Sequence, residues 1–281
     1  MRTRKARAMH DRVRSFAQLH ERGNPLVLPN AWDAASARIF EAEGFSALAT
    51  SSAAMAYALG YPDGERMNLD EMIAAIGRIT RTVRISVTAD AEAGYGDECG
   101  ALVAVMERIV HAGAVGVNVE DWDVRGGAPF PLDVAHDRIA AIKTHLGDSL
   151  FVNARTDLYL QDVGDPATRF AATVERLRAF VAAGADGVFV PGVTDAATIA
   201  ALVDAVAPTP LNVLGGPATP PVSEMRALGV GRVSVGAGPM RRVLGETRAI
   251  ARELREHGTF TFMRDERAIP YAELNALFDR H

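Results

Sequence analysis

Eight short apolar runs, each followed by a segment long enough to form an amphipathic helix, constrain most strongly how this chain can fold. The runs span residues 25–29, 47–50, 85–89, 115–120, 150–155, 187–190, 211–214 and 233–236. The helix-length segments span 31–43, 69–80, 98–111, 132–146, 167–183, 195–206, 221–228 and 241–257. Short Val/Ile/Leu strands that alternate with helices indicate parallel βαβ units. The pattern therefore predicts an α/β protein.

Eight such units in 281 residues, with no internal linker, favour a single domain over residues 1–281 with a (β/α)8 TIM-type barrel fold. An open doubly wound sheet would be expected to carry a Gly-rich turn after its first strand, whereas this chain continues with Asn-Ala-Trp-Asp (30–33). Residues 258–281 follow the eighth helix as an additional C-terminal helical segment. Their apolar side chains lead us to expect this tail at a subunit interface.

Composition excludes several classes of protein. The net charge of −5 and the absence of a Lys/Arg block beyond residue 14 argue against a nucleic-acid partner. The single cysteine, Cys99, excludes an internal disulfide framework, and no apolar run approaches the length of a membrane span. The basic N-terminus lacks the apolar core of an export signal, so we expect a cytoplasmic protein. Residues 2–22 are predicted to form an amphipathic first helix with Phe16 and Leu19 on its apolar side.

Polar residues gather where the predicted strands end, which is where barrels of this kind place their active sites. Extended backbone puts residues two apart on one face, so Asp90 and Glu92, Asn118 and Glu120, and Asn153 and Arg155 are expected to form pairs. Three neighbouring acids call for a cation, and a hard divalent ion such as Mg²⁺ or Mn²⁺ suits them. Other strand-end residues are Trp32, Ser51, Ser52, Tyr95, Asp157 and Asn212.

A structural interpretation competes with this one. An acidic residue or serine after a strand often caps the next helix, Trp32 alone would more often be core, and the glycines at 94 and 96 are first of all a requirement of a turn. For one Asp the structural role is the commoner. For three acids, an arginine and a serine pair at successive strand ends, we expect a ligand site, with Arg155 binding a carboxylate or phosphonate in bidentate fashion.

Several motifs together resemble the isocitrate lyase and phosphoenolpyruvate mutase superfamily over nearly the whole chain. The most specific are Asp-Ala-Glu-Ala-Gly-Tyr-Gly (90–96), Gly-Val-Asn-Val-Glu-Asp (116–121) and Asn-Ala-Arg-Thr-Asp (153–157). Ala-Thr-Ser-Ser (49–52) and Leu-Gly-Tyr-Pro-Asp (59–63) support them, and the match runs from Pro-Asn-Ala-Trp-Asp (29–33) to Arg-Val-Ser-Val-Gly (232–236).

The resemblance implies an α/β barrel, a Mg²⁺ ion held largely through water, and an enolate intermediate made from a 2-oxo or 2-hydroxy acid. Asp90 is then the leading metal ligand, with Asp63, Glu92 and Glu120 nearby. Arg155 binds the substrate, and Ser51, Ser52 and Ala53 form an anion pocket. Arg155, Glu120 and Tyr95 are the expected catalytic residues, and Trp32 and Asn212 further substrate contacts. A homotetramer that exchanges a C-terminal helix is also implied.

One loop departs from the pattern of the resemblance. The lyase branch carries Lys, Cys, Gly and His after the fourth strand and the mutase branch Lys and Asn, whereas residues 122–131 here are Trp-Asp-Val-Arg-Gly-Gly-Ala-Pro-Phe-Pro. Pro191 stands where the phosphonate branch has a histidine. The Gly pair still predicts a lid.

We therefore expect C–C cleavage by a lyase or decarboxylase, with water or Tyr95 as the proton source, rather than a Cys-dependent isocitrate cleavage. The alternatives are a P–C bond enzyme acting on phosphonopyruvate-like substrates and a non-catalytic barrel that binds a diacid.

Overall fold

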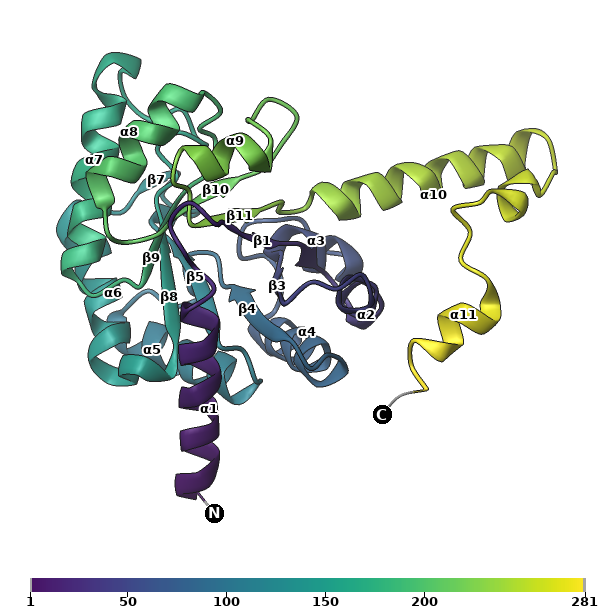
Figure 1. Ribbon diagram of the computed structural model, residues 1–281, viewed down its shortest axis with the longest axis horizontal. Helices are drawn as coiled ribbons and strands as arrows, with labels where there is room; N and C mark the ends of the chain where they lie inside the picture. Colours follow the sequence, from purple (N-terminus) through teal and green to yellow (C-terminus); the bar gives the residue numbers. More distant parts are fainter. Residues whose placement is uncertain (1, 280–281) are drawn as a thin grey trace.

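The computed structural model describes residues 2–279 and shows a closed parallel barrel surrounded by helices (Figure 1). The first barrel strand has two parts, β1 (Leu26–Leu28) and β2 (Asn30–Ala31), separated by Pro29. Proline has no N–H for the ladder, but its carbonyl accepts a bond of 2.9 Å from Ala49 N, so β2 continues the sheet. The other strands are β3 (Ala47–Thr50), β4 (Ser86–Asp90), β5 (Gly116–Glu120), β8 (Phe151–Arg155), β9 (Gly187–Val190), β10 (Leu211–Leu214) and β11 (Arg232–Ser234).

All pairings in this sheet are parallel, and β1 pairs with β11 while β2 pairs with β3, which closes the barrel. The predicted (β/α)8 fold with eight strands is therefore confirmed. The helices are α1 (Arg2–Ala17), α2 (Ala34–Ala42), α3 (Ser52–Leu59), α4 (Leu69–Thr82), α5 (Cys99–His111), α6 (Leu132–Leu146), α7 (Pro166–Ala182), α8 (Ala196–Val206), α9 (Val222–Ala227), α10 (Gly238–Glu256) and α11 (Tyr271–Ala276). Two 3-10 turns, Gly147–Ser149 and Thr261–Arg264, complete the set. No helix in the described range is long and apolar enough to span a bilayer.

Two clusters form the core. The larger one fills the layer between the strands and the surrounding helices. The smaller one lies where α1 meets the sheet, and its centre is Phe16, which is fully buried and packs edge-on against Phe151 at 5.4 Å. The first helix ends at Ala17 rather than at residue 22, because the chain turns through Gly23, whose φ of 77° is a left-handed conformation.

The sequence did not predict α3, whose uniformly apolar sequence lacks a helical stripe. Ser51 caps its N-terminus by accepting a bond from Ala54 N, and Gly60 ends it at φ 86°. The expectation that Glu92 continues the strand was also wrong. β4 ends at Asp90, and Glu92 has φ 51°, so a left-handed turn and not strand alternation directs this side chain.

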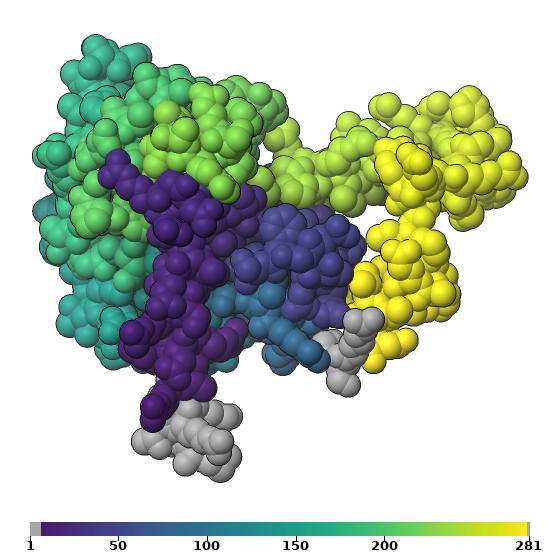
Figure 2. All heavy atoms as spheres, viewed as in Figure 1, coloured from purple at the N-terminus to yellow at the C-terminus, as the bar shows by residue number. Residues whose placement is uncertain are grey.

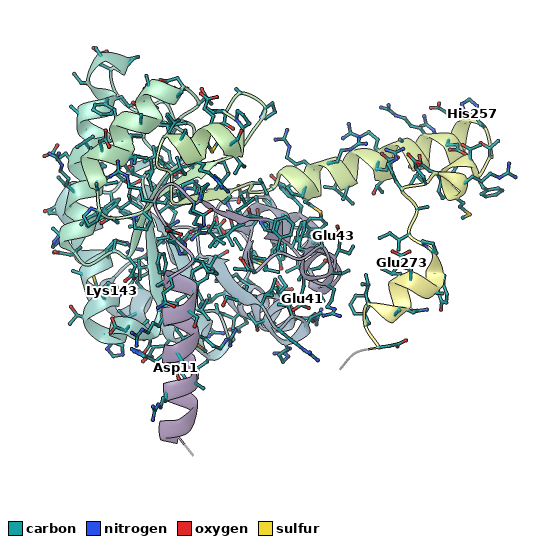
Figure 3. All side chains as sticks on the ribbon, viewed as in Figure 1. Asp11, Glu41, Glu43, Lys143, His257 and Glu273 are labelled. Atoms are coloured by element: carbon teal, nitrogen blue, oxygen red, sulfur yellow. The ribbon has the colours of Figure 1, made fainter. Side chains whose placement is uncertain are left out.

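The C-terminal arm, residues 238–279, leaves the barrel. Only Met240 of α10 is buried, and the helix projects away from the body before the chain folds back (Figures 1 and 2). Glu273 of α11 lies toward Glu41 and Glu43 at the end of α2, with His257 at the far tip of the arm (Figure 3). Arg38 Nε donates to the carbonyl of Leu277 at 2.8 Å, which ties the returning segment to α2. The eighth predicted helix therefore exists but does not cover the barrel, and the last two residues of the predicted tail lie outside the described range.

Candidate active site

Three charged side chains end three adjacent strands at the carboxyl edge of the barrel. Asp90 ends β4, Glu120 ends β5 and Arg155 ends β8. The sheet register places Asp90 beside Asn118 and Glu120 beside Arg155. The strands therefore bring these predicted residues together.

Arg155 is the centre of a buried ion-pair cluster. Its Nε and Nη2 donate to the two carboxylate oxygens of Asp157 at 2.5 and 2.7 Å, and its Nη1 lies 2.7 Å from Glu120 Oε2. Burial opposes the charge of the guanidinium, yet the carboxylates of Glu120 and Asp157 raise the Arg155 pKa above its usual value. Burial raises the pKa of Glu120, and Arg155 offsets that effect. These acids use three of the five N–H groups of Arg155, so two remain for a ligand.

Asp90 is held from one side only. Its Oδ2 accepts bonds from Ser52 N at 3.1 Å and Ser52 Oγ at 2.9 Å, and its backbone N–H donates to Thr50 Oγ1. Its Oδ1 is buried and has no hydrogen-bond partner among the described residues. Ser51 and Ser52, predicted to bind an anion, therefore cap α3 and orient Asp90 respectively. Ala53, which follows them on α3, is half-buried.

Glu92 lies in a second acid group that the β4–α5 turn builds. It is 4% exposed, and its two carboxylate oxygens accept bonds from the hydroxyl of Tyr95, at 2.9 Å, and from the backbone N–H of Glu65. Burial raises the Glu92 pKa to about 7, and raises the Tyr95 pKa too. Glu65, Glu92 and Tyr95 all have φ between 51° and 56°. Left-handed non-glycine residues are costly, and they gather at functional sites.

Asp63 lies in the loop between α3 and α4. Its pKa is raised, first by burial and then by the negative charge of Asp90. The second cause indicates that the two carboxylates are electrostatic neighbours, although no hydrogen bond joins them.

A cavity of about 880 Å³ opens beside this group and is lined by Glu65, Arg66, Tyr95, Asp97 and Arg125 among others. Tyr95 and Glu65 connect this cavity to the acid group around Glu92. The space between Glu120, Arg155 and Phe130 is almost completely filled, with only about 10 Å³ left. Of the other predicted substrate contacts, Trp32 is partly buried against the core, and Asn212 is fully buried in a bond to Ser234. The structure brings neither of them to this cavity.

The loop over the site contains a short antiparallel hairpin, β6 (Trp122–Asp123) with β7 (Ala128–Pro129). Two arginines that the sequence analysis missed anchor its base. Arg176 donates to Asp121 Oδ2 at 3.0 Å and to the carbonyl of Phe130 at 2.9 Å. At the tip, Arg125 pairs with Asp97 across the cavity mouth.

Arg138 is the other missed anchor, and it donates to the carbonyls of Ala93, Gly96 and Asp97 and lies over the Phe130 ring. It stands on the buried stripe of α6 with Ala135, Ile139 and Ile142, and an arginine on such a stripe is the signal that could have found it.

The donor set suits a hard divalent cation held mainly through water. Among residues 2–279 no three His, Cys, Asp or Glu side chains are spaced to hold a metal together. Mg²⁺ usually keeps several waters and takes only one or two protein carboxylates. The unpartnered, buried Asp90 Oδ1 is the atom that such an ion would satisfy, with Asp63 and Glu92 near enough to bind its waters.

A closed parallel barrel with charged side chains gathered at the carboxyl ends of its strands is the arrangement in which barrel enzymes place their active sites. The family model described as phosphoenolpyruvate phosphomutase matches residues 16–255, and the chain belongs to this family within the isocitrate lyase and phosphoenolpyruvate mutase superfamily. The named members of the superfamily are lyases and mutases, so the chain is a member of an enzyme superfamily.

Three relatives illustrate the range. A structure from Burkholderia cenocepacia J2315, described as a lyase/mutase by inference, superposes with a TM-score of 0.88 at 36% identity over 96% of both chains. The oxaloacetate decarboxylase of Paraburkholderia xenovorans (strain LB400) is 32% identical over 73% of this chain and 69% of its own length. An oxaloacetate acetylhydrolase in complex with oxalate gives a TM-score of 0.83 at 26% identity, covering 95% of this chain and 94% of that chain.

Proposed function

We propose that this protein is a Mg²⁺-dependent enzyme that cleaves a C–C bond of a small 2-oxo or 2-hydroxy acid through an enolate, with decarboxylation as the simplest form. The proposal depends on two features of nearby strand ends, an acid that could bind a metal ion and an arginine that could bind a carboxylate. Asp90 presents a buried carboxylate oxygen with no partner, and Arg155 on the second strand along keeps two N–H donors beyond those used by Glu120 and Asp157.

Different residues would bind the metal ion, bind the substrate and supply the proton. Asp90 would hold Mg²⁺, with Asp63, Glu92 and Glu120 binding its waters; when bound, the ion supplies a Lewis acid for the 2-oxo oxygen. Arg155 binds a substrate carboxylate through its two remaining N–H groups. When CO₂ leaves, the electron pair of the broken C–C bond moves onto the oxo acid, and the fixed charge of Arg155 stabilises it as it develops. Water or the Tyr95 hydroxyl then protonates the carbon.

Two of the relatives favour this assignment, because both are named as enzymes that act on oxaloacetate. The loop 122–131 supplies no Cys, Lys or His, so a mechanism that takes its proton from a loop cysteine is unsupported. The second candidate is cleavage of a P–C bond in a phosphonopyruvate-like acid, which the matching family model favours. Pro191 and the Lys-free loop count against it, since neither supplies a group to assist transfer at phosphorus.

The test is turnover of oxaloacetate and phosphonopyruvate with Mg²⁺ and with EDTA, followed by NMR of the products. Mg²⁺ alone promotes oxaloacetate decarboxylation. The rate with the wild-type protein is therefore compared with the rate with Asp90→Asn at the same Mg²⁺ concentration. Asp204→Asn, at an exposed position that does not line the cavity, is the matched control. We expect pyruvate formation that needs both Mg²⁺ and Asp90. Equal rates for the wild type and Asp90→Asn would refute the proposal, and phosphonopyruvate cleavage alone would establish the second candidate.

A further inference from the structure

Arg232 is a buried cation inside the barrel that the proposed chemistry does not use. It begins β11 and is fully buried, and its register neighbours are Asn212 on β10 and Leu26 on β1. Barrel interiors of this fold are usually filled by branched apolar side chains, which makes an arginine there exceptional.

Its hydrogen bonding is incomplete. Nη2 donates to Asn118 Oδ1 at 3.2 Å, whereas Nε and Nη1 have no partner within residues 2–279 and no carboxylate in that range forms an ion pair with it. Arg155 and Arg138, also buried, each make at least three bonds. A buried charge without a paired acid destabilises a fold, so stability does not explain this arginine.

The side-chain amide of Asn118 links Arg232 to the end of β4, where Asp90 lies. Asn118 Oδ1 accepts bonds from Arg232 Nη2 and from Asn153 Nδ2, the latter at 2.9 Å, so its orientation is fixed. Asn118 is the register partner of Asp90, and its backbone carbonyl accepts a bond of 3.1 Å from Ala91 N, immediately after Asp90. Arg232 is thus connected to the end of β4.

The charges agree with this connection. Burial lowers the Arg232 pKa to about 9, so the side chain stays charged at neutral pH, and Asp90 is the acid that opposes the effect of burial. Burial lowers the pKa of His20, which follows α1, and the charge of Arg232 lowers it further. Arg232 begins β11 whereas Asp90 ends β4, so Arg232 stands below the strand ends and reaches the neighbourhood of Asp90 through Asn118.

We propose that Arg232 is a positioning residue whose fixed positive charge, acting from beneath the strand ends and through Asn118, offsets the acids around Asp90 so that an anionic substrate binds there. The proposal rests on the proposed function for the nature of the substrate. At the strand ends Arg155 is already shared by Glu120 and Asp157, which leaves Asp63, Asp90 and Glu92 without a paired cation in the described structure. A second cation below these acids reduces their electrostatic repulsion of a substrate carboxylate.

If Arg232 has this role, its removal should change the binding of an anion and the binding of a divalent cation in opposite directions. A cation near Asp90 favours an anion and opposes a divalent cation, so its removal should weaken the first and strengthen the second. A purely structural arginine would on removal weaken both, or neither. At a separation of roughly 10 Å in water-like screening, one unit charge changes the binding of a divalent ion about fourfold.

The experiment compares Arg232→Met and Arg232→Gln with the wild type in the intact protein. Val233→Ala is the control, because Val233 is on the same strand but belongs to the apolar layer under the helices. Mn²⁺ affinity is measured by titration calorimetry, KM and kcat with oxaloacetate, and thermal unfolding on each variant. We expect Mn²⁺ to bind at least about threefold more tightly in both Arg232 variants. We expect KM to rise at least about threefold with a smaller change in kcat. The melting temperature should not fall in Arg232→Met.

Mn²⁺ affinity unchanged in both variants would overturn the proposal, as would weaker Mn²⁺ binding together with a lower melting temperature. Should Arg232→Met not fold, Arg232→Gln retains the polarity and decides by the same Mn²⁺ measurement. A wild-type protein that binds Mn²⁺ but turns over no 2-oxo acid would refute the proposed function alone, and the Mn²⁺ comparison would still decide the role of Arg232.

Discussion

Arg155→Lys is the substitution that tests the active-site cluster most directly. Lysine keeps the positive charge but has no planar fork, so it cannot hold Asp157 in bidentate fashion and also reach Glu120 and a substrate carboxylate. The wild-type side chain makes three charged bonds, at 2.5, 2.7 and 2.7 Å. The loss of even one charge-assisted bond costs about 1.5–3 kcal/mol. If that bond is made in the transition state, kcat/KM falls about 10- to 150-fold.

The assay is kcat/KM for the best 2-oxo or 2-hydroxy acid, corrected for the fraction of folded protein. Thermal unfolding is followed in parallel, because Glu120 and Asp157 are buried and lose part of their partner. Arg22→Lys is the control, since Arg22 is exposed and pairs with Asp204, and neither residue lines the cavity. A value for Arg155→Lys within twofold of the wild type, with Arg22→Lys equally active, would refute the assignment of Arg155 as the carboxylate-binding residue.

Four further predictions use other observations. The Glu92 pKa is raised from 4.5 to about 7 on folding, so its contribution to stability is complete below pH 4.5 and is lost as the pH rises through 7. Glu92→Gln should therefore flatten the decline in unfolding free energy of the metal-free protein between pH 5 and 7.5, a term of at most about 3 kcal/mol, and an unaltered slope in urea titrations would contradict this. Asp90→Ala should abolish the rise in melting temperature that Mg²⁺ or Mn²⁺ causes, and an undiminished rise would show that another residue holds the ion. Residues 122–131 should exchange amide hydrogens faster in the free protein than with a bound diacid, while equal protection in both states would count against a lid. The exposed apolar residues of the C-terminal arm, among them Phe260, Met263 and Tyr271, should be covered in a homo-oligomer, which we propose to be a tetramer; a monomer mass by light scattering at micromolar concentration would exclude it.

The barrel could be predicted from the sequence because its signals are local. Each strand is a short apolar run, and residues such as Gly44, Gly113 and Gly184 adopt positive φ where a helix ends before the next strand. What failed was equally local in origin. The α3 segment is apolar on all sides and carries no stripe. The first helix ends at Ala17, ahead of the turn at Gly23, and the ring of His20 packs edge-on against Phe16.

The direction of α10 could not be predicted, because an amphipathic pattern shows that a helix has an apolar side and not which surface covers it. The pattern alone would have placed this helix on the barrel. In the structure only Met240 is buried, and the helix projects from the body (Figure 1).

Apart from Asp63, which lies in the loop between α3 and α4, the acids of the candidate site were predictable because each ends or follows a strand in the sequence. Their partners were not, because the pairing is long-range: Arg155 with Glu120, Arg176 with Asp121 and Arg232 with Asn118 each join residues distant in the chain. Asp157, two residues after Arg155, could equally have been a loop residue by sequence, yet it is 1% exposed and holds the guanidinium.

The buried arginines show how a site with this many carboxylates is kept together. Arg176 bonds to Asp121 and to a carbonyl, and Arg138 bonds to three carbonyls although its Nε has no partner among the described residues, so both hold loops in place and have polar partners close to their charge. Arg155 is held by Glu120 and Asp157 and keeps two N–H groups that these acids do not use. Arg232 has two unpartnered nitrogens, so its charge acts at a distance. Since burying an unpaired charge lowers stability, we attribute its presence beneath Asp90 to the ligands that we propose to bind there.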